Sequence, residues 1–189
     1  FYVMDGSKYN ESVDNAVNDI NGIDTNYAAV YYPWIKIMDP VKSKPMWVPP
    51  SVVLPGVISF TDSVAHEWFA PAGLNRGGLG SVLEAATRLT HTERDDLYEG
   101  RVNPIASFPG QGVVVFGQKT LQGKPSALDR INVRRLLIRL RKFIASTSRF
   151  LVFEQNTQAT RNRFLNIVNP FLEEVQSNSG LSAFRVVMD

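Results

Sequence analysis

The feature that most restricts the fold is a stretch between residues 101 and 156, where a buried strand is followed by an amphipathic, basic helix. Residues 113–116 form a short β-branched run bounded by glycines, which is typical of a buried strand. At about 100° per residue, residues 132–144 separate into an apolar arc and a cationic arc. The apolar arc contains Val133, Leu136, Leu137, Leu140, Phe143 and Ile144. The cationic arc contains Arg134, Arg135, Arg139, Arg141 and Lys142, with Ile138 in their midst. A strand packed on this helix predicts a core with one cationic surface.

The rest of the chain alternates short apolar runs with segments of helical spacing. Strands are expected at residues 1–5, in two segments of residues 26–38 separated by Pro33, and at residues 46–50, 150–153 and 181–188. Helices are expected at residues 8–20, at 51–68 behind an N-cap at Ser51, and at 92–97 behind a capping box from Thr90 to Glu93. A further helix is expected at 158–176, with an N-cap at Thr157 and a kink or break at Pro170. This alternation predicts an α/β (α+β) fold, a layered mixed β-sheet flanked by helices, in a single domain spanning residues 1–189.

Composition excludes several classes of protein chemistry. The chain has no cysteine, which excludes disulfide bonds and thiolate chemistry and favours a reducing compartment. No apolar run approaches the roughly 18 residues of a membrane span, so no membrane partner is expected. Both ends resemble strand sequence and the chain opens on Phe1. We therefore expect a fragment of a longer protein, truncated at both ends.

Charge is distributed unevenly along the chain. Residues 1–100 carry 13 acidic and 7 basic side chains, whereas residues 101–189 carry 5 acidic and 13 basic ones. This polarity suits a partner of one sign, or head-to-tail association of identical subunits. The alternative is that both sets of charges mix on one folded surface.

Signals for catalysis or metal binding are weak. His66 and His91 have no second ligand at metal-binding spacing. Residues 77–80 are glycine-rich but lack the Gly-Lys-Ser/Thr of a phosphate loop, so we expect a flexible loop. The acidic run of residues 93–99 lacks the pattern of a calcium loop and is expected to be a solvated helix face. The sequence therefore predicts no enzyme, no cofactor and no metal site.

The cationic arc of the 132–144 helix is the strongest functional candidate, and three interpretations compete. It is a solvated face, a phosphate-binding surface, or a docking surface for an acidic protein. The phosphate interpretation lacks an interleaved aromatic side chain for base stacking. The docking interpretation is favoured by Ile138, a lone apolar residue among five cations.

Several long motifs, in order, resemble the C-terminal part of contractile tail sheath proteins of bacteriophages. The segments that carry the resemblance are residues 47–51, 68–73, 101–105, 108–117, 132–136 and 150–156. They include Asn103-Pro104-Ile105 and the run Phe-Pro-Gly-Gln-Gly of residues 108–112. The resemblance covers nearly the whole chain. It favours the sheaths of phages over the related sheaths of phage-tail-like bacteriocins and type VI secretion.

The resemblance implies a structural protein of the virion tail, assembled in the cytoplasm of the host bacterium. Sheath subunits form hexameric rings stacked helically around an inner tail tube, and on a signal from the baseplate the sheath contracts and drives the tube through the host envelope. The implied partners are other sheath subunits, the tube and the baseplate, without direct nucleic acid contact. The basic helix is expected to face the acidic tube through Arg134, Arg135, Ile138, Arg139, Arg141 and Lys142. Terminal arms are expected to complete a neighbour's sheet. The alternative is a nucleic-acid-binding module that uses the same helix.

Overall fold

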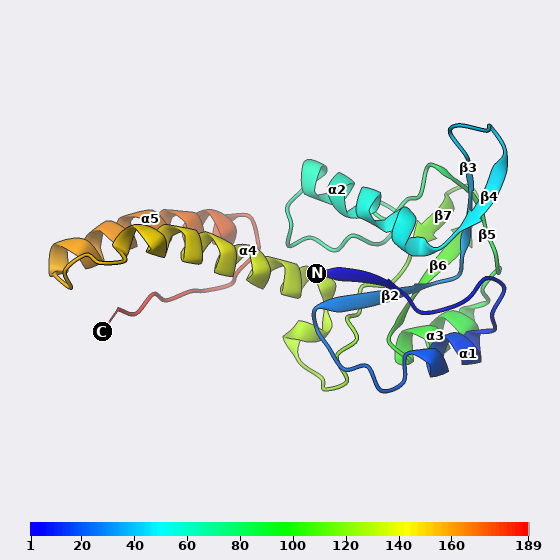
Figure 1. Ribbon diagram of the computed structural model, residues 1–189, viewed down its shortest axis with the longest axis horizontal. Coiled ribbons are helices and arrows are strands. Elements are labelled where there is room, and N and C mark those ends of the chain that lie inside the picture. The colour runs from blue at the N-terminus through cyan, green and yellow to red at the C-terminus, as the bar shows by residue number, and fades with distance from the viewer. Residues whose placement is uncertain (189) are drawn as a thin grey trace. The chain divides into compact units, whose positions relative to one another are not determined.

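The computed structural model describes residues 1–188, and its central element is the strand β2, Ala28–Tyr32, which is buried at every position (Figure 1). β2 pairs in parallel with β1 (Tyr2–Asp5) on one side and with β6 (Val102–Phe108) on the other. β6 pairs antiparallel with β7 (Gly112–Val115), which gives the strand order β1-β2-β6-β7. The sheet is therefore mixed, and the strand expected at residues 113–116 is confirmed as β7.

A second, antiparallel sheet follows β2 directly. It consists of β3 (Ile35–Met38) between β4 (Pro45–Val48) and β5 (Val82–Ala85). The two extended segments expected on either side of Pro33 are confirmed as β2 and β3. Mixed sheets with flanking helices confirm the α/β class.

Two apolar cores lie on the opposite faces of the four-stranded sheet, because successive side chains of a strand point to opposite faces. Ala29 and Tyr31 of β2 belong to one core, with Leu54 and Val57 of the helix α2 (Leu54–Val64). Ala28, Val30 and Tyr32 belong to the other, with Ala16 of α1 (Val13–Asp19) and Leu97 of α3 (His91–Glu99). In Figure 1, α1 and α3 accordingly cover one face of the sheet and α2 the other.

Two predicted helices are shorter than expected. Helix α1 begins after Ser12, whose hydroxyl accepts the amide hydrogen of Asn15, and not at residue 8. The expected N-cap at Ser51 is wrong: its hydroxyl donates to the Asp5 carboxylate at 2.5 Å, and Val53 holds the N-cap position of α2. Proline residues explain the late start, since Pro50 opens the short 3-10 helix η1 (Pro50–Val52) before α2 begins.

Helix α3 begins with the predicted capping box. The Thr90 hydroxyl accepts the amide hydrogen of Glu93 at 3.3 Å, and the Glu93 carboxylate accepts the amide hydrogen of Thr90 at 2.8 Å. The backbone N–H of Thr90, and then its hydroxyl, lower the pKa of Glu93. The capping box therefore stabilises α3 with an ionised carboxylate.

We expect Thr90→Ala to lower the free energy of unfolding by about 1 kcal/mol at neutral pH, because the amide of Glu93 loses its cap. The contribution of the ionised Glu93 is fully present above its unfolded pKa and is lost as the pH falls through its lowered folded pKa. The difference between the variant and wild type should therefore shrink in acid. Urea denaturation at several pH values measures it, with the exposed neighbour Thr92→Ala as the control. An equal loss in both variants would contradict the capping role.

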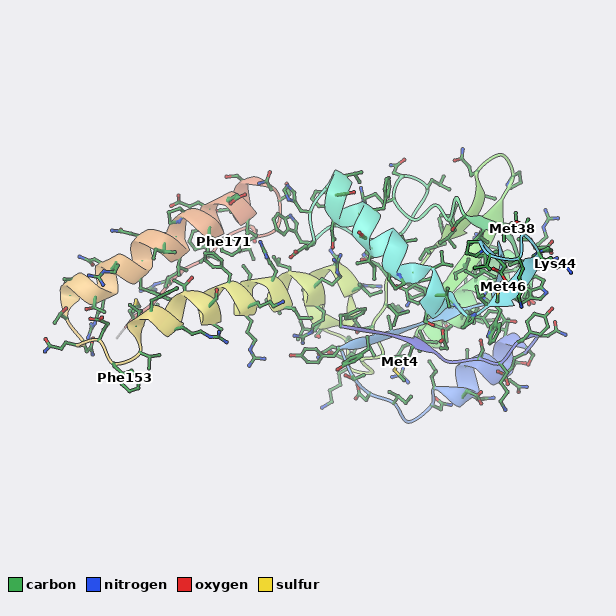
Figure 2. The ribbon with its side chains drawn as sticks, turned by 45° about the horizontal axis from the view of Figure 1, so that its top comes forward. Met4, Met38, Lys44, Met46, Phe153 and Phe171 are labelled. Atoms are coloured by element: carbon green, nitrogen blue, oxygen red, sulfur yellow. The ribbon has the colours of Figure 1, made fainter. Side chains whose placement is uncertain are left out.

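The chain divides into two compact units, Phe1–Arg134 and Arg135–Asp189. The second is a helical hairpin of α4 (Ile131–Ser148) and α5 (Gln158–Ser177), which lie side by side in Figures 1 and 2. Phe143 and Phe171 stack between them, with ring centroids 3.8 Å apart. Thr157 caps α5 as its position predicts. Of the kink or break expected at Pro170, the break is wrong, because α5 continues through that residue.

Two other predictions for this unit are wrong. The expected strand at residues 150–153 is the connection between α4 and α5, where the 3-10 helix η3 (Arg149–Leu151) leads into a turn. Residues 181–188 form no strand and pair with no other segment of residues 1–188. Both runs have strand-like composition, but neither pairs with a strand among residues 1–188. Within the described chain, no helix combines the length and apolar character that crossing a membrane requires.

Candidate partner-binding surface

Helix α4 carries all of the residues predicted to bind a partner, and it extends beyond the predicted segment at both ends, from Ile131 to Ser148. Its start is fixed in the first unit, where the backbone N–H of Ile131 donates to the carbonyl of Gln118. The Asn132 side chain donates to the carbonyl of Trp68 at 3.3 Å. The first turn of α4 is therefore tied to the sheet unit by hydrogen bonds.

Arg134 differs from the other predicted cations because it is buried, with 8% of its surface exposed. Its guanidinium lies over the ring of Tyr27, 4.3 Å from the centroid, and its Nε atom has no hydrogen-bond partner among residues 1–188. This cation–π contact holds Arg134 inside the chain. The helical wheel treats all cations alike and could not distinguish this one, because Tyr27 is distant in sequence.

The buried stripe of α4 is narrower than the predicted apolar arc. It follows Leu136, Leu140 and Thr147, with Phe143 packed against Phe171. Leu137 and Ile144, both in the predicted arc, are 38% and 36% exposed. A surface therefore remains on α4 where apolar and cationic side chains are both accessible.

The other predicted residues divide into two groups. Arg135 and Arg139 already have interaction partners within the protein. Arg141 and Lys142 are exposed, and neither has an ion-pair partner in the part of the chain that the structure describes. Ile138 is half-buried, so its own neighbours already cover part of it. Arg141 and Lys142 are thus the cations of α4 that are available to an acidic partner.

Sequence reasoning missed a group of exposed apolar side chains at the turn between α4 and α5. Phe150 is 82% exposed, Val152 57% and Phe153 102%. Figure 2 shows Phe153 at the end of the hairpin, directed away from both helices. We call Phe150, Val152 and Phe153 the hydrophobic tip. The position of this run in the sequence could have indicated it. Residues 150–153 are apolar but lie between two helical segments, so no strand close in sequence is there to pair with them.

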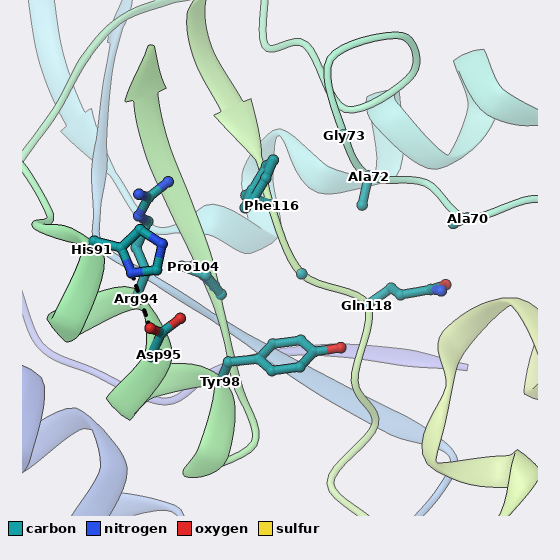
Figure 3. A pocket seen from close by; sticks show the side chains of 11 residues that line it. Ala70, Ala72, Gly73, His91, Arg94, Asp95, Tyr98, Pro104, Phe116 and Gln118 are labelled. Carbon is teal, nitrogen blue, oxygen red and sulfur yellow. Dashed lines mark ion pairs between the residues drawn. The ribbon is translucent and has the colours of Figure 1, made fainter.

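The first unit contains a separate, partly apolar cavity of about 420 Å³. Side chains of α3 line it on one side and the loop of residues 70–73 on the other, with Phe116 between them (Figure 3). The Arg94 guanidinium lies 5.7 Å from the centroid of the Phe116 ring, and His91 forms an exposed ion pair with Asp95 at 3.0 Å. Among residues 1–188, no group of three or more acidic or histidine side chains is arranged to hold a metal ion. The cavity is suited to an apolar group beside charged ones.

Comparison with known proteins identifies tail sheath proteins as relatives. The family described as phage tail sheath protein central domain matches residues 1–121. The chain is 37% identical over 174 residues to the tail sheath protein of Vibrio phage KVP40, covering 92% of this chain and 26% of that protein. It is 34% identical over 194 residues to the tail sheath protein of Enterobacteria phage T4, covering 97% of this chain and 29% of that protein. The chain thus spans little more than a quarter of the length of these relatives.

Solved structures of contractile assemblies share its fold. The sheath of an extracellular contractile injection system, PVC, in the contracted state superimposes with a TM-score of 0.83 at 28% identity, over 97% of this chain and 50% of that one. The helical sheath of the anti-feeding prophage in the contracted state gives a TM-score of 0.74 at 26% identity, over 97% of this chain and 48% of that one.

Proposed function

Because this chain belongs to the phage tail sheath protein family, we propose that it is part of a structural subunit whose copies form hexameric rings stacked around an inner tail tube. Contraction of that stack would drive the tube through the host envelope, after assembly in the host cytoplasm. The likeness to sheath structures solved in the contracted state supports a subunit of this kind. A further relative, from the baseplate of the anti-feeding prophage, supports contact with a baseplate.

Within this assembly we assign tube binding to the exposed cations of α4. The observation that carries the assignment is that Arg141 and Lys142 are exposed without an ion-pair partner among residues 1–188. Exposed ion pairs contribute about 0.2–1 kcal/mol each, so single contacts with an acidic tube break easily. Many such ion pairs, repeated from subunit to subunit, together hold the tube before contraction. Large buried apolar contacts would instead oppose release of the tube. Arg134 is left out of this contact because its guanidinium is held against Tyr27.

Residues 181–188 are the part of the chain best suited to pair with a neighbouring subunit. They pair with no strand among residues 1–188, while β1 ends the four-stranded sheet with an open edge. An unpaired extended segment and an open edge on another copy complement each other by strand addition. We therefore assign to this segment the role of the arm that joins neighbouring subunits.

We expect the double variant Arg141→Glu/Lys142→Glu to bind tail tubes about tenfold more weakly per subunit, since it replaces two attractions with two repulsions. Co-sedimentation of the sheath protein with purified tubes measures the effect, and wild-type binding should weaken as salt is raised.

The matched control is Lys42→Glu/Lys44→Glu, which makes the same change of charge at exposed positions in the turn between β3 and β4. Equal losses in both variants would show a general charge effect, and unchanged binding of the α4 variant would remove the assignment. Salt-dependent binding of DNA by α4 in place of tubes would support the nucleic-acid alternative.

A further inference from the structure

An asparagine-glycine pair, Asn21-Gly22, forms the turn that follows helix α1. The backbone N–H of Ile23 donates to the carbonyl of Ile20 at 3.1 Å, which places the pair at the two central positions of a β-turn. Gly22 has a φ of +99°, and a type II turn requires a positive φ at this position. Both residues of the pair are exposed. The turn therefore presents the Asn21 side chain and the peptide bond that follows it to water.

Neither reactive group of this pair is held in place by a hydrogen bond. Among residues 1–188, the side-chain amide of Asn21 has no hydrogen-bond partner and the backbone N–H of Gly22 has no acceptor. A Cβ at Gly22 would meet no atom within 4 Å, so the space beside its backbone nitrogen is open. Glycine also leaves the backbone freer to rotate than any other residue does. The backbone nitrogen of Gly22 is thus able to approach the side-chain carbonyl carbon of Asn21.

The sequence contains no other asparagine that is followed by glycine. Asn103 precedes a proline, which has no backbone N–H. The Asn132 side chain is held by its hydrogen bond to the carbonyl of Trp68. Asn75 is exposed in a turn, as Asn21 is, but the next residue is an arginine, whose side chain hinders access to its backbone nitrogen. Asn21 therefore combines exposure, an unrestrained side chain and an unhindered neighbouring amide.

We propose that Asn21 is a site of spontaneous deamidation, in which the backbone nitrogen of Gly22 is the nucleophile. This nitrogen attacks the side-chain carbonyl carbon of Asn21, and a new C–N bond forms. The side-chain nitrogen leaves as ammonia and takes the proton of the attacking amide with it, which leaves a cyclic imide. Water then opens the imide at either carbonyl group, giving aspartate or isoaspartate at position 21. The reaction takes place within one chain and does not depend on tube binding.

The modification alters the end of α1 in two ways. Isoaspartate routes the main chain through the former side chain and so adds a methylene group between Ile20 and Ile23. Ile20 is buried with 2% of its surface exposed, and the Arg101 guanidinium donates to the carbonyl of Ile23 at 3.2 Å, so neither end of the turn moves freely. Either product also places a negative charge beside the C-terminal end of α1, where the helix dipole disfavours it and the last turn has no basic residue. The modified chain should therefore be less stable.

Ageing of the folded protein in neutral buffer, followed by peptide mass spectrometry, measures conversion at each asparagine. We expect conversion at Asn21 to be about tenfold faster than at Asn75, because glycine offers no side chain to hinder the attack. A protein isoaspartyl methyltransferase with a labelled methyl donor measures the isoaspartate separately. Direct hydrolysis of the side chain gives aspartate alone, whereas the cyclic imide gives both products. Equal conversion at Asn21 and Asn75, or conversion without isoaspartate, would overturn the proposal.

Two variants test the nucleophile and the structural consequence. Gly22→Ala should slow conversion about tenfold, and an unchanged rate in the folded variant would show that the Gly22 nitrogen is not the nucleophile. The comparison of Asn21 with Asn75 is made within wild type, so it holds even if the positive φ of Gly22 prevents this variant from folding. Asn21→Gln keeps the amide but closes a larger ring more slowly. Aged wild type should unfold at about 0.5 M less urea than aged Asn21→Gln, and equal midpoints would remove the expected loss of stability.

Discussion

Asn103→Ala is expected to lower the free energy of unfolding by about 3–5 kcal/mol, because it leaves several buried backbone groups without partners. Asn103 is fully buried in β6. Its side-chain amide donates to the carbonyls of Val30 and Lys119 at 3.0 and 2.8 Å, and its carbonyl oxygen accepts the amide hydrogen of Lys119 at 2.6 Å. The side chain thus attaches the segment after β7 to the centre of the sheet.

Urea denaturation of the two proteins measures this loss, with Asn166→Ala as the control at an exposed position of α5. The control should stay within about 0.5 kcal/mol of wild type, as surface substitutions usually do. An Asn103→Ala variant equally close to wild type would show that water replaces all three hydrogen bonds. The expected loss gives a physical role to Asn103 in the Asn-Pro-Ile segment, one of the segments on which the resemblance to tail sheaths rests.

The elements that the sequence predicted best are those specified by local patterns. The strand at residues 113–116 is a continuous β-branched run, and the helix at 158–176 has both an N-cap at Thr157 and apolar residues at helical spacing. The capping box at Thr90 is local as well, since its partners lie three residues apart. Each of these signals is complete within one segment and needs no knowledge of the rest of the fold.

The features that local patterns could not predict depend on contacts between residues distant in sequence. Residues 150–153 have the composition of a strand, but the stacking of Phe143 on Phe171 brings α4 and α5 together and makes that run their connection. Arg134 matches its neighbours in type and spacing, and only Tyr27 distinguishes it. The division into two compact units depends likewise on tertiary contacts, and the single domain expected from the sequence stays a prediction.

The glycine-rich segment of residues 77–80 shows the same limit of local patterns. Its composition suggested a flexible loop, yet the segment lies along β7. The amide of Val115 donates to the carbonyl of Gly77 at 2.8 Å, and the amide of Leu79 donates to the carbonyl of Val113 at 2.9 Å. These hydrogen bonds hold the segment against the sheet in the manner of a short additional strand. The close approach of the two backbones requires a residue without a side chain at Gly77.

We expect Gly77→Ala to destabilise the protein by about 3 kcal/mol, because the added methyl group has no room. A Cβ at Gly77 would lie 2.6 Å from the carbonyl oxygen of Val115 and 2.8 Å from the amide nitrogen of Gly73. Both are backbone atoms joined by a hydrogen bond of 2.8 Å, so neither moves without breaking it. Gly78→Ala is the matched control, since a Cβ there meets no atom within 4 Å. Thermal and urea denaturation compare the two variants, and equal stability would show that the loop shifts freely.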